Sequence, residues 1–196
     1  MIEWIIAAAV GTPLLIGLGI ALFKEDRKIR AMHEAADVLD LDLIHTDVRF
    51  PRLEGHIDEI PLAVYRKYEG RSGRLVAQAD PRGLPPEVDL VMTGIPSEKK
   101  RRRMEKQPPR ARIESIAKLE SSNQDVLDAL LDHEAALEAL WSLHCRHPHV
   151  SFEFGEIVVR LGDFAEASEL IETLQDVASH AMQLEAAFEQ TPIVVH

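Results

Sequence analysis

The chain has only one cysteine, Cys145, so it cannot form an internal disulfide. It also has no GxSxG elbow, no P-loop, no GxGxxG fingerprint and no HExxH zinc motif. A lone cysteine fits a reducing compartment. These absences exclude the disulfide-stapled class and leave no motif on which an enzyme could be assigned. We therefore expect no catalytic residue and no cofactor.

Charge is also absent from one long run, Trp4 to Phe23, which spans 20 residues. At about 1.5 Å per helical residue, this run matches the roughly 30 Å hydrocarbon core of a bilayer. Basic residues follow the run and none precedes it; they are Lys24, Arg27, Lys28 and Arg30. The positive-inside rule then predicts a single-pass anchor over residues 1–23 in a bacterial inner membrane, with the rest of the chain cytoplasmic.

Two alternatives to an uncleaved anchor are a cleaved signal peptide and a buried helix of a soluble fold. The residues before Trp4 include no lysine or arginine, which argues against a signal peptide. Small residues spaced four apart would allow the anchor to pack against another helix; they are Ala7 with Gly11, and Gly17 with Ala21.

After the anchor, residues 24–41 have helical spacing and predict a charged stalk. Extended runs then follow, separated by turn residues; they cover 52–57, 60–68, 75–79 and 88–92. A helix from Gln124, a hairpin at 150–161 and a final helix to about Gln190 complete the chain. Because strands cluster rather than alternate with helices, we expect an α+β fold over 42–196: an antiparallel meander with C-terminal helices.

Two boundaries are less distinct. Residues 112–120 fit a helix and a strand, and we favour the strand. The final helix is expected to start with a capping box made by Asp163 and Glu166, and Ser122 or Asn123 is expected to cap the helix at Gln124.

A basic segment interrupts an otherwise acidic chain of net charge −11. Residues 98–112 hold eight lysines and arginines against Glu98 and Glu105. Prolines on both sides predict a mobile loop at about 94–111. Its candidate contact residues are Lys99, Lys100, Arg101, Arg102, Arg103 and Lys106. They could bind anionic lipid, contact an acidic protein, remain solvated, or dock onto the acidic helices of the same chain. Nucleic acid is not expected, because no aromatic residue lies among them.

Four potential metal ligands lie within six residues: His144, Cys145, His147 and His149. If a strand begins near Val150, His147 and His149 point to one face and could share an ion. The spacing matches no structural zinc pattern, and no second ligand pair accompanies it. We therefore interpret the segment as a polar connection and expect no metal.

The layout resembles uncharacterised bacterial single-pass membrane proteins. The resemblance is carried by Pro51 to Gly55 running into Ile60 to Tyr65, and by Leu130-Leu131-Asp132 before a short hairpin. Residues 96–111 depart from it as a basic insertion. The resemblance implies the anchor and the fold but brings no activity.

The sequence therefore favours a non-enzymatic, membrane-tethered module that binds or scaffolds another protein, with the membrane lipid as its other partner. Two alternatives remain open. One is a metal-dependent or acid–base enzyme that uses the His144–His149 region, and the other is an envelope-linked sensor of a lipid or small ligand.

Overall fold

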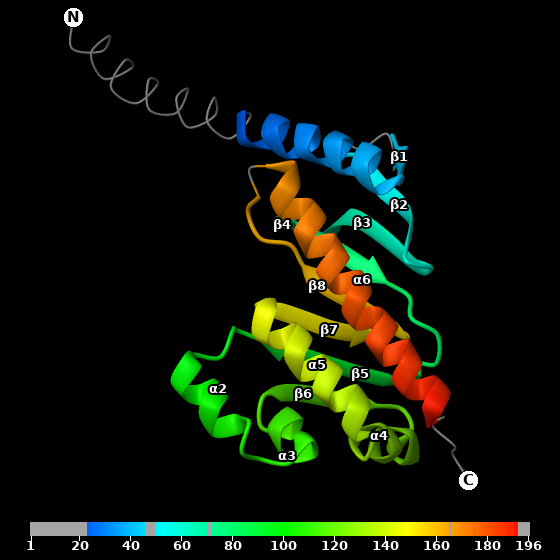
Figure 1. The fold of residues 1–196 in the computed structure, drawn as a ribbon, viewed down its shortest axis with the longest axis vertical. Helices are drawn as coiled ribbons and strands as arrows, with labels where there is room; N and C mark the ends of the chain where they lie inside the picture. Colours follow the sequence, from blue (N-terminus) through cyan, green and yellow to red (C-terminus); the bar gives the residue numbers. More distant parts are fainter. Residues whose placement is uncertain (1–22, 46–49, 70–71, 165, 192–196) are drawn as a thin grey trace, which may run out of the picture.

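The computed structural model describes residues 23–45, 50–69, 72–164 and 166–191. Within them, eight strands form one sheet in the order β1-β2-β3-β4-β8-β7-β5-β6 (Figure 1). Every neighbouring pair is antiparallel. Helices lie against this sheet, so the fold is α+β.

The prediction of a membrane-spanning helix over residues 4–23 is corrected here. In the part of the chain that the structure describes, no helix is both long enough and apolar enough to cross a bilayer. The prediction came from the hydropathy of the sequence, which does not by itself establish a membrane-spanning helix. All of that run except Phe23 lies outside the described residues. The single-pass assignment and the inner-membrane location with a cytoplasmic domain depended on that helix, and both are withdrawn with it.

Residues 23–39 are helical and carry an apolar stripe at three-to-four spacing. Ala31, Met32, Ala35 and Ala36 on this stripe are buried and belong to the hydrophobic core. The helix crosses the β1–β2 end of the sheet (Figure 1). The sequence interpretation gave these residues to a stalk, but the buried stripe makes them part of the domain.

The first half of the sheet is a meander, whose last three strands were predicted and whose first, at 42–44, was not. Its strands are β1 (Asp42–Ile44), β2 (Arg52–Ile57), β3 (Ile60–Glu69) and β4 (Ser72–Ala79). Asp58 and Glu59 form the two-residue turn between β2 and β3, and both have positive φ, 49° and 72°. Two left-handed central residues define a type I′ turn, whose twist matches that of the flanking strands.

The second half does not continue the meander. Its strands are β5 (Val88–Thr93), β6 (Ala117–Ser121), β7 (His149–Glu153) and β8 (Glu156–Arg160). The β7–β8 hairpin inserts between β4 and β5, so β4 pairs with β8 and β5 pairs with β7. The predicted meander would place β5 beside β4, and this is wrong. Pairing between segments that are distant in the sequence leaves no local pattern from which it could be predicted.

Residues 112–120 divide between the two structures that their pattern allowed. Helix α3 (Pro109–Glu114) occupies the first part and β6 the rest. Pro109 is at the first helical position, where its fixed φ and missing N–H suit a helix start. The favoured strand is thus correct only from Ala117.

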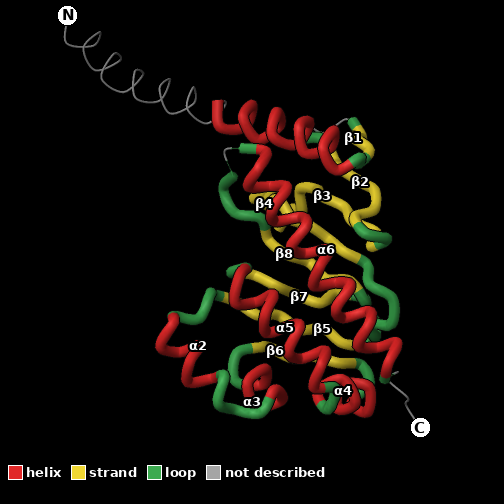
Figure 2. The backbone as a smooth tube through the Cα atoms, in the orientation of Figure 1, coloured by secondary structure: helices red, strands yellow, loops and turns green. Residues whose placement is uncertain are grey.

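The remaining helices are α4 (Gln124–Leu131), α5 (Glu134–Arg146) and α6 (Ala167–Gln190). Asn123 caps α4 as predicted, since its side chain accepts from the Asp125 amide. The predicted capping box of the last helix does not form: α6 starts at Ala167 with no side-chain cap, and Asp163 pairs with Lys28 instead. Helices α5 and α6 lie over one face of the sheet (Figure 2).

The opposite face, which we call the outer face, is turned away from α5 and α6. Strand β5 shows the alternation: Leu90 and Met92 are buried, whereas Asp89, Val91 and Thr93 are exposed. The sheet therefore separates a core on the helical side from a surface on the outer side.

Candidate functional site

The basic segment is ordered. Helix α2 (Glu98–Met104) begins after Ser97, whose hydroxyl accepts from the Lys100 amide at 3.4 Å. Along the helix, Arg102 pairs with Glu98 and Arg101 pairs with Glu105, each at i,i+4 spacing. The segment predicted as a loop at 94–111 thus contains α2 and the start of α3. The prolines that suggested a loop lie before α2 and at the start of α3, where proline is tolerated.

Arg112 fixes this segment to the domain. Its guanidinium is buried and lies 5.3 Å from the centroid of the Trp141 ring. It donates to the Glu138 carboxylate at 2.7 Å and to the carbonyl oxygens of Met104 and Gln107. Arg112 is therefore a structural anchor between α2, α3 and α5 rather than a free cation.

Arg110 is also engaged within the chain. Its guanidinium donates to Glu114 at 3.0 Å, Asp128 at 2.9 Å and Asp132 at 2.7 Å. Hydrogen bonds to these three carboxylates raise the pKa of Arg110 above its ordinary value, with that to Asp132 making the largest contribution. Docking of the basic segment onto the acidic helices, one of the four outcomes considered from the sequence, thus occurs at this arginine.

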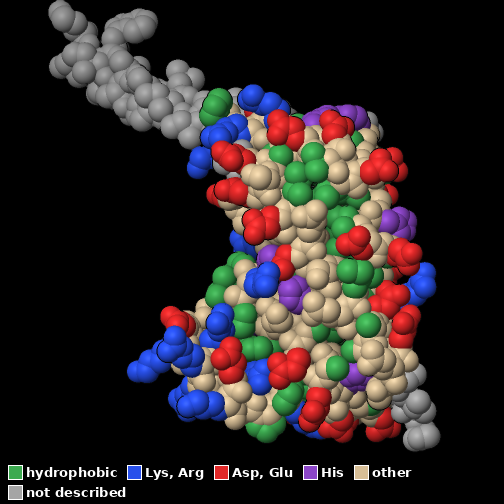
Figure 3. Space-filling view, viewed as in Figure 1, with side chains coloured by type: hydrophobic (Ala, Val, Ile, Leu, Met, Phe, Trp, Pro, Cys, Tyr) green, Lys and Arg blue, Asp and Glu red, His purple; other side chains and the backbone are tan. Residues whose placement is uncertain are grey.

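Four cations of the segment remain without an acidic partner within the described part of the chain. They form what we call the α2 basic face: Lys99, Lys100, Arg103 and Lys106. All four are exposed, and Lys99 and Arg103 lie one helical turn apart. Figure 3 shows basic side chains projecting from the molecule at α2. Ile95, just before the helix, is 52% exposed and adds an apolar side chain beside them.

The four candidate metal ligands separate in the structure. His144 is buried against Trp141, and its Nδ1 has no hydrogen-bond partner. Burial, followed by the positive charge of Lys100, lowers the pKa of His144. The ring is therefore neutral at physiological pH.

Cys145 is half-buried, and burial is the main cause that raises the pKa of its thiol. A protonated thiol is a poor nucleophile and a poor metal ligand. Within the described residues, no group of three or more His, Cys, Asp or Glu side chains is placed to hold a metal ion.

His147 and His149 contact different sides of the fold, although a strand extended through both residues would have placed them on one face. His147 donates from Nε2 to Asp176 of α6 at 2.8 Å. His149 begins β7 on the outer face, where Arg160 Nη1 lies 3.4 Å from its Nε2. The expected shared face fails because His147 precedes the strand and caps the end of α5.

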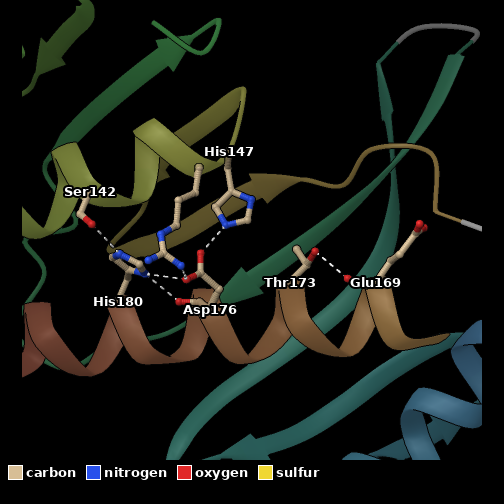
Figure 4. A network of polar contacts seen from close by, with 7 residues as sticks. Ser142, His147, Glu169, Thr173, Asp176 and His180 are labelled. Atoms are coloured by element: carbon tan, nitrogen blue, oxygen red, sulfur yellow. Dashed lines mark hydrogen bonds and ion pairs between the residues drawn. The ribbon is translucent and has the colours of Figure 1, made fainter. Parts of the chain in front are cut away.

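A polar network that sequence reasoning missed joins α5 to α6 (Figure 4). Arg146 donates to Asp176 at 2.6 Å beside the His147 contact. One turn further on, His180 donates from Nδ1 to the Asp176 carbonyl oxygen at 2.8 Å, so its Nε2 accepts from the Ser142 hydroxyl at 3.0 Å. The only signal in the sequence was a histidine within the apolar stripe of the last helix.

This Ser142–His180 pair has the hydrogen bond of a nucleophile and its base but lacks the other parts of a hydrolase site. Ser142 lies inside α5, so the amides around it are used by the helix and cannot hold an oxyanion. Arg112 and Arg146, which line the same pocket as Ser142, are bonded to carboxylates, Arg112 to Glu138 and Arg146 to Asp176. We therefore interpret the network as a link between two helices.

The proposed packing residues of the anchor, Ala7, Gly11, Gly17 and Ala21, lie outside the described residues.

Comparison with known proteins adds little. No protein-family model matches the chain, and no curated protein matches it. A solved structure, the mycobacterial trehalose monomycolate transport factor A (TtfA), is similar with a TM-score of 0.48 and 9% identity. The match covers 85% of this chain and 97% of that one.

Proposed function

We propose that this chain is a non-enzymatic binding module that docks an acidic segment of a partner protein on the α2 basic face. One observation carries the proposal. Arg101, Arg102, Arg110 and Arg112 all pair with carboxylates, whereas Lys99, Lys100, Arg103 and Lys106 have no such partner in the described chain.

Lys99, Lys100 and Arg103 lie on α2, and Lys106 lies in the turn that directly follows it. Ser97 caps α2, Met104 is buried beneath it, and Arg112 bonds the Met104 carbonyl. An ordered surface loses little conformational entropy on binding, so more of the contact energy appears as affinity. Exposed Ile95 offers the apolar contact around which a charged rim is effective.

The charge of the remaining chain supports the same choice of partner. The net charge is −11 although the basic segment is included. An acidic partner is therefore repelled from most of the surface and directed to α2. The lack of aromatic residues in α2 disfavours a nucleic acid, which would need a stacking surface.

A binding function is preferred to the enzyme hypothesis because the residues of that hypothesis are dispersed. His144 is buried, His147 bonds Asp176, and His149 lies on the outer face. A general acid–base site needs its groups to converge on one reacting atom.

The test is titration of the purified chain with a fluorescent oligoglutamate peptide at about 50 mM salt, where exposed charges are weakly screened. Exposed ion pairs contribute roughly 0.2–1 kcal/mol each, so replacing all four cations with glutamine should weaken binding about tenfold. The proposal is overturned if the wild type does not bind the peptide, or if a single-stranded oligonucleotide or anionic vesicles bind α2 more tightly.

A further inference from the structure

The outer face of the sheet carries a cavity of about 240 Å³ over β3, β4, β8, β7 and β5. Its apolar lining on this face comes from Val76 of β4, Val158 of β8 and Val91 of β5. The cavity lies on the opposite side of the sheet from α5 and α6 and does not involve α2, so it is separate from the surface proposed above.

The floor of this cavity is unusual for an open sheet face. Val76 is 5% exposed and Val158 is 6% exposed, although neither points into the core. In register, Val76 lies between Tyr65 and Arg160, and longer polar side chains surround it. The apolar floor is therefore sunk below a polar rim.

The sequence of the two central strands shows the same feature. Strand β8 reads Ile157-Val158-Val159 and β4 reads Leu75-Val76-Ala77, with all three residues buried in each run. A strand that faces water on one side alternates apolar and polar residues, as β5 does. Continuous apolar runs are typical of strands covered on both faces, so the outer side of β4 and β8 is suited to a covering group.

The rim is basic. Arg160 contacts His149 and no carboxylate within the described chain, and Arg74 lines the same cavity from β4. Arg74, His149 and Arg160 also line a second cavity of about 440 Å³, which continues past the strand ends toward Lys28 and Arg66. The acidic residues nearby are engaged, Glu153 with Lys67 and Asp163 with Lys28. At the junction of the two cavities, the Arg160 side chain therefore lies beside an apolar floor, which is an arrangement suited to an anion with an apolar group.

We propose that this groove binds a small anionic amphiphile, a carboxylate or phosphate head on a short apolar chain. The head bonds Arg160, since a guanidinium group holds such anions through paired hydrogen bonds. The chain lies on Val76, Val158 and Val91. Ligand sites of drug-sized molecules occupy about 300–1,000 Å³, so a cavity of about 240 Å³ takes only a short chain.

Decanoate and decyl phosphate are the probes, measured by calorimetry below their micellar concentrations, and they separate the two head groups. Decanol and inorganic phosphate each supply one half of the ligand. We expect saturable binding of at least one decyl anion, with both half-ligands binding about tenfold more weakly or not at all. Equal affinity for decanol, or no saturable binding of either anion, overturns the proposal.

Two variants locate the site. Arg160→Gln should weaken binding of the decyl anion about tenfold, whereas Lys118→Gln, on the exposed edge strand β6, should not change it. If Arg160→Gln does not fold, amide shifts of the wild type on titration must still map to β4, β7 and β8; shifts mapping elsewhere contradict the site. The α2 glutamine variant should bind the decyl anion as the wild type does, so failure here is distinct from failure of the acidic-partner proposal.

Discussion

The guanidinium of Arg112 lies over the indole ring of Trp141, with only 5.3 Å between the charged carbon and the ring centroid. Arg112 comes from α3 and Trp141 from α5, so the contact joins the basic segment to the helical layer. Through this contact and its hydrogen bonds, a segment rich in like charges is held as ordered helices.

Replacing Arg112 should therefore loosen the whole basic segment. Arg112→Ala removes the ring contact and takes away the donor to the Gln107 carbonyl and to the Glu138 carboxylate, whereas the Met104 carbonyl keeps the Gln107 amide. The change should cost about 2–4 kcal/mol of unfolding free energy. Arg112→Lys keeps the positive charge but not the planar guanidinium group, so it should restore only part of the lost unfolding free energy. Urea denaturation measures the loss, and amide exchange over 98–114 should rise more than elsewhere. If amide hydrogen exchange rises equally over the whole chain, Arg112 does not specifically hold the basic segment in place.

His144 should make the fold less stable in mild acid. Its pKa is lowered in the folded chain, so below the unfolded value near 6.5 the unfolded state binds more protons. The contribution of His144 to the unfolding free energy should therefore be constant above that pH and fall as the pH drops below it. Because Nδ1 is buried without a partner, His144→Leu should be neutral or stabilising by about 1 kcal/mol at pH 7. The variant should also flatten the decline in unfolding free energy below about pH 6.5. An unchanged slope would assign the decline to another group.

The Asp176 carboxylate should stabilise the α5–α6 contact rather than act in catalysis. Asp176→Asn weakens the bonds to Arg146 and His147, and it should cost about 1–2 kcal/mol of unfolding free energy. A double-mutant cycle with His147→Gln should give a coupling energy of at least about 0.5 kcal/mol. Additive effects would mean that the two side chains do not depend on each other.

The helix at residues 23–39 should behave as core. Met32 is fully buried, so Met32→Ala should destabilise the chain by about 2–5 kcal/mol. Val38 on the same helix is 66% exposed, and Val38→Ala should change the stability by less than about 0.5 kcal/mol. Equal, small effects at both positions would restore the interpretation of this helix as a stalk.

The sequence predicted local structure well where one pattern dominated. The extended runs at 60–68 and 88–92 and the Asn123 cap each depend on neighbours in the chain, and each was found. The sheet order was not predictable in the same way. Insertion of β7 and β8 between β4 and β5 joins segments far apart in sequence, and only tertiary packing decides it.

The candidate sites show the same division. The basic segment was evident from composition, but which of its cations are free depends on Asp128, Asp132 and Glu138, which lie on later helices. Arg160 and Val76 gave no local signal at all, because their adjacency comes from strand register. The apolar runs of β4 and β8 indicate a covered outer face only when it is known which of their residues lie on each face of the sheet.

The most direct test of the acidic-partner proposal compares two variants with the same net charge. One replaces the α2 basic face with glutamines, and the other replaces four exposed cations elsewhere, Lys24, Arg27, Arg30 and Arg82. Oligoglutamate affinity is measured for both by fluorescence anisotropy. The account predicts an affinity about tenfold lower for the first variant and close to wild type for the second. Equal losses in both would show that the peptide responds only to net charge, and would contradict a docking surface on α2.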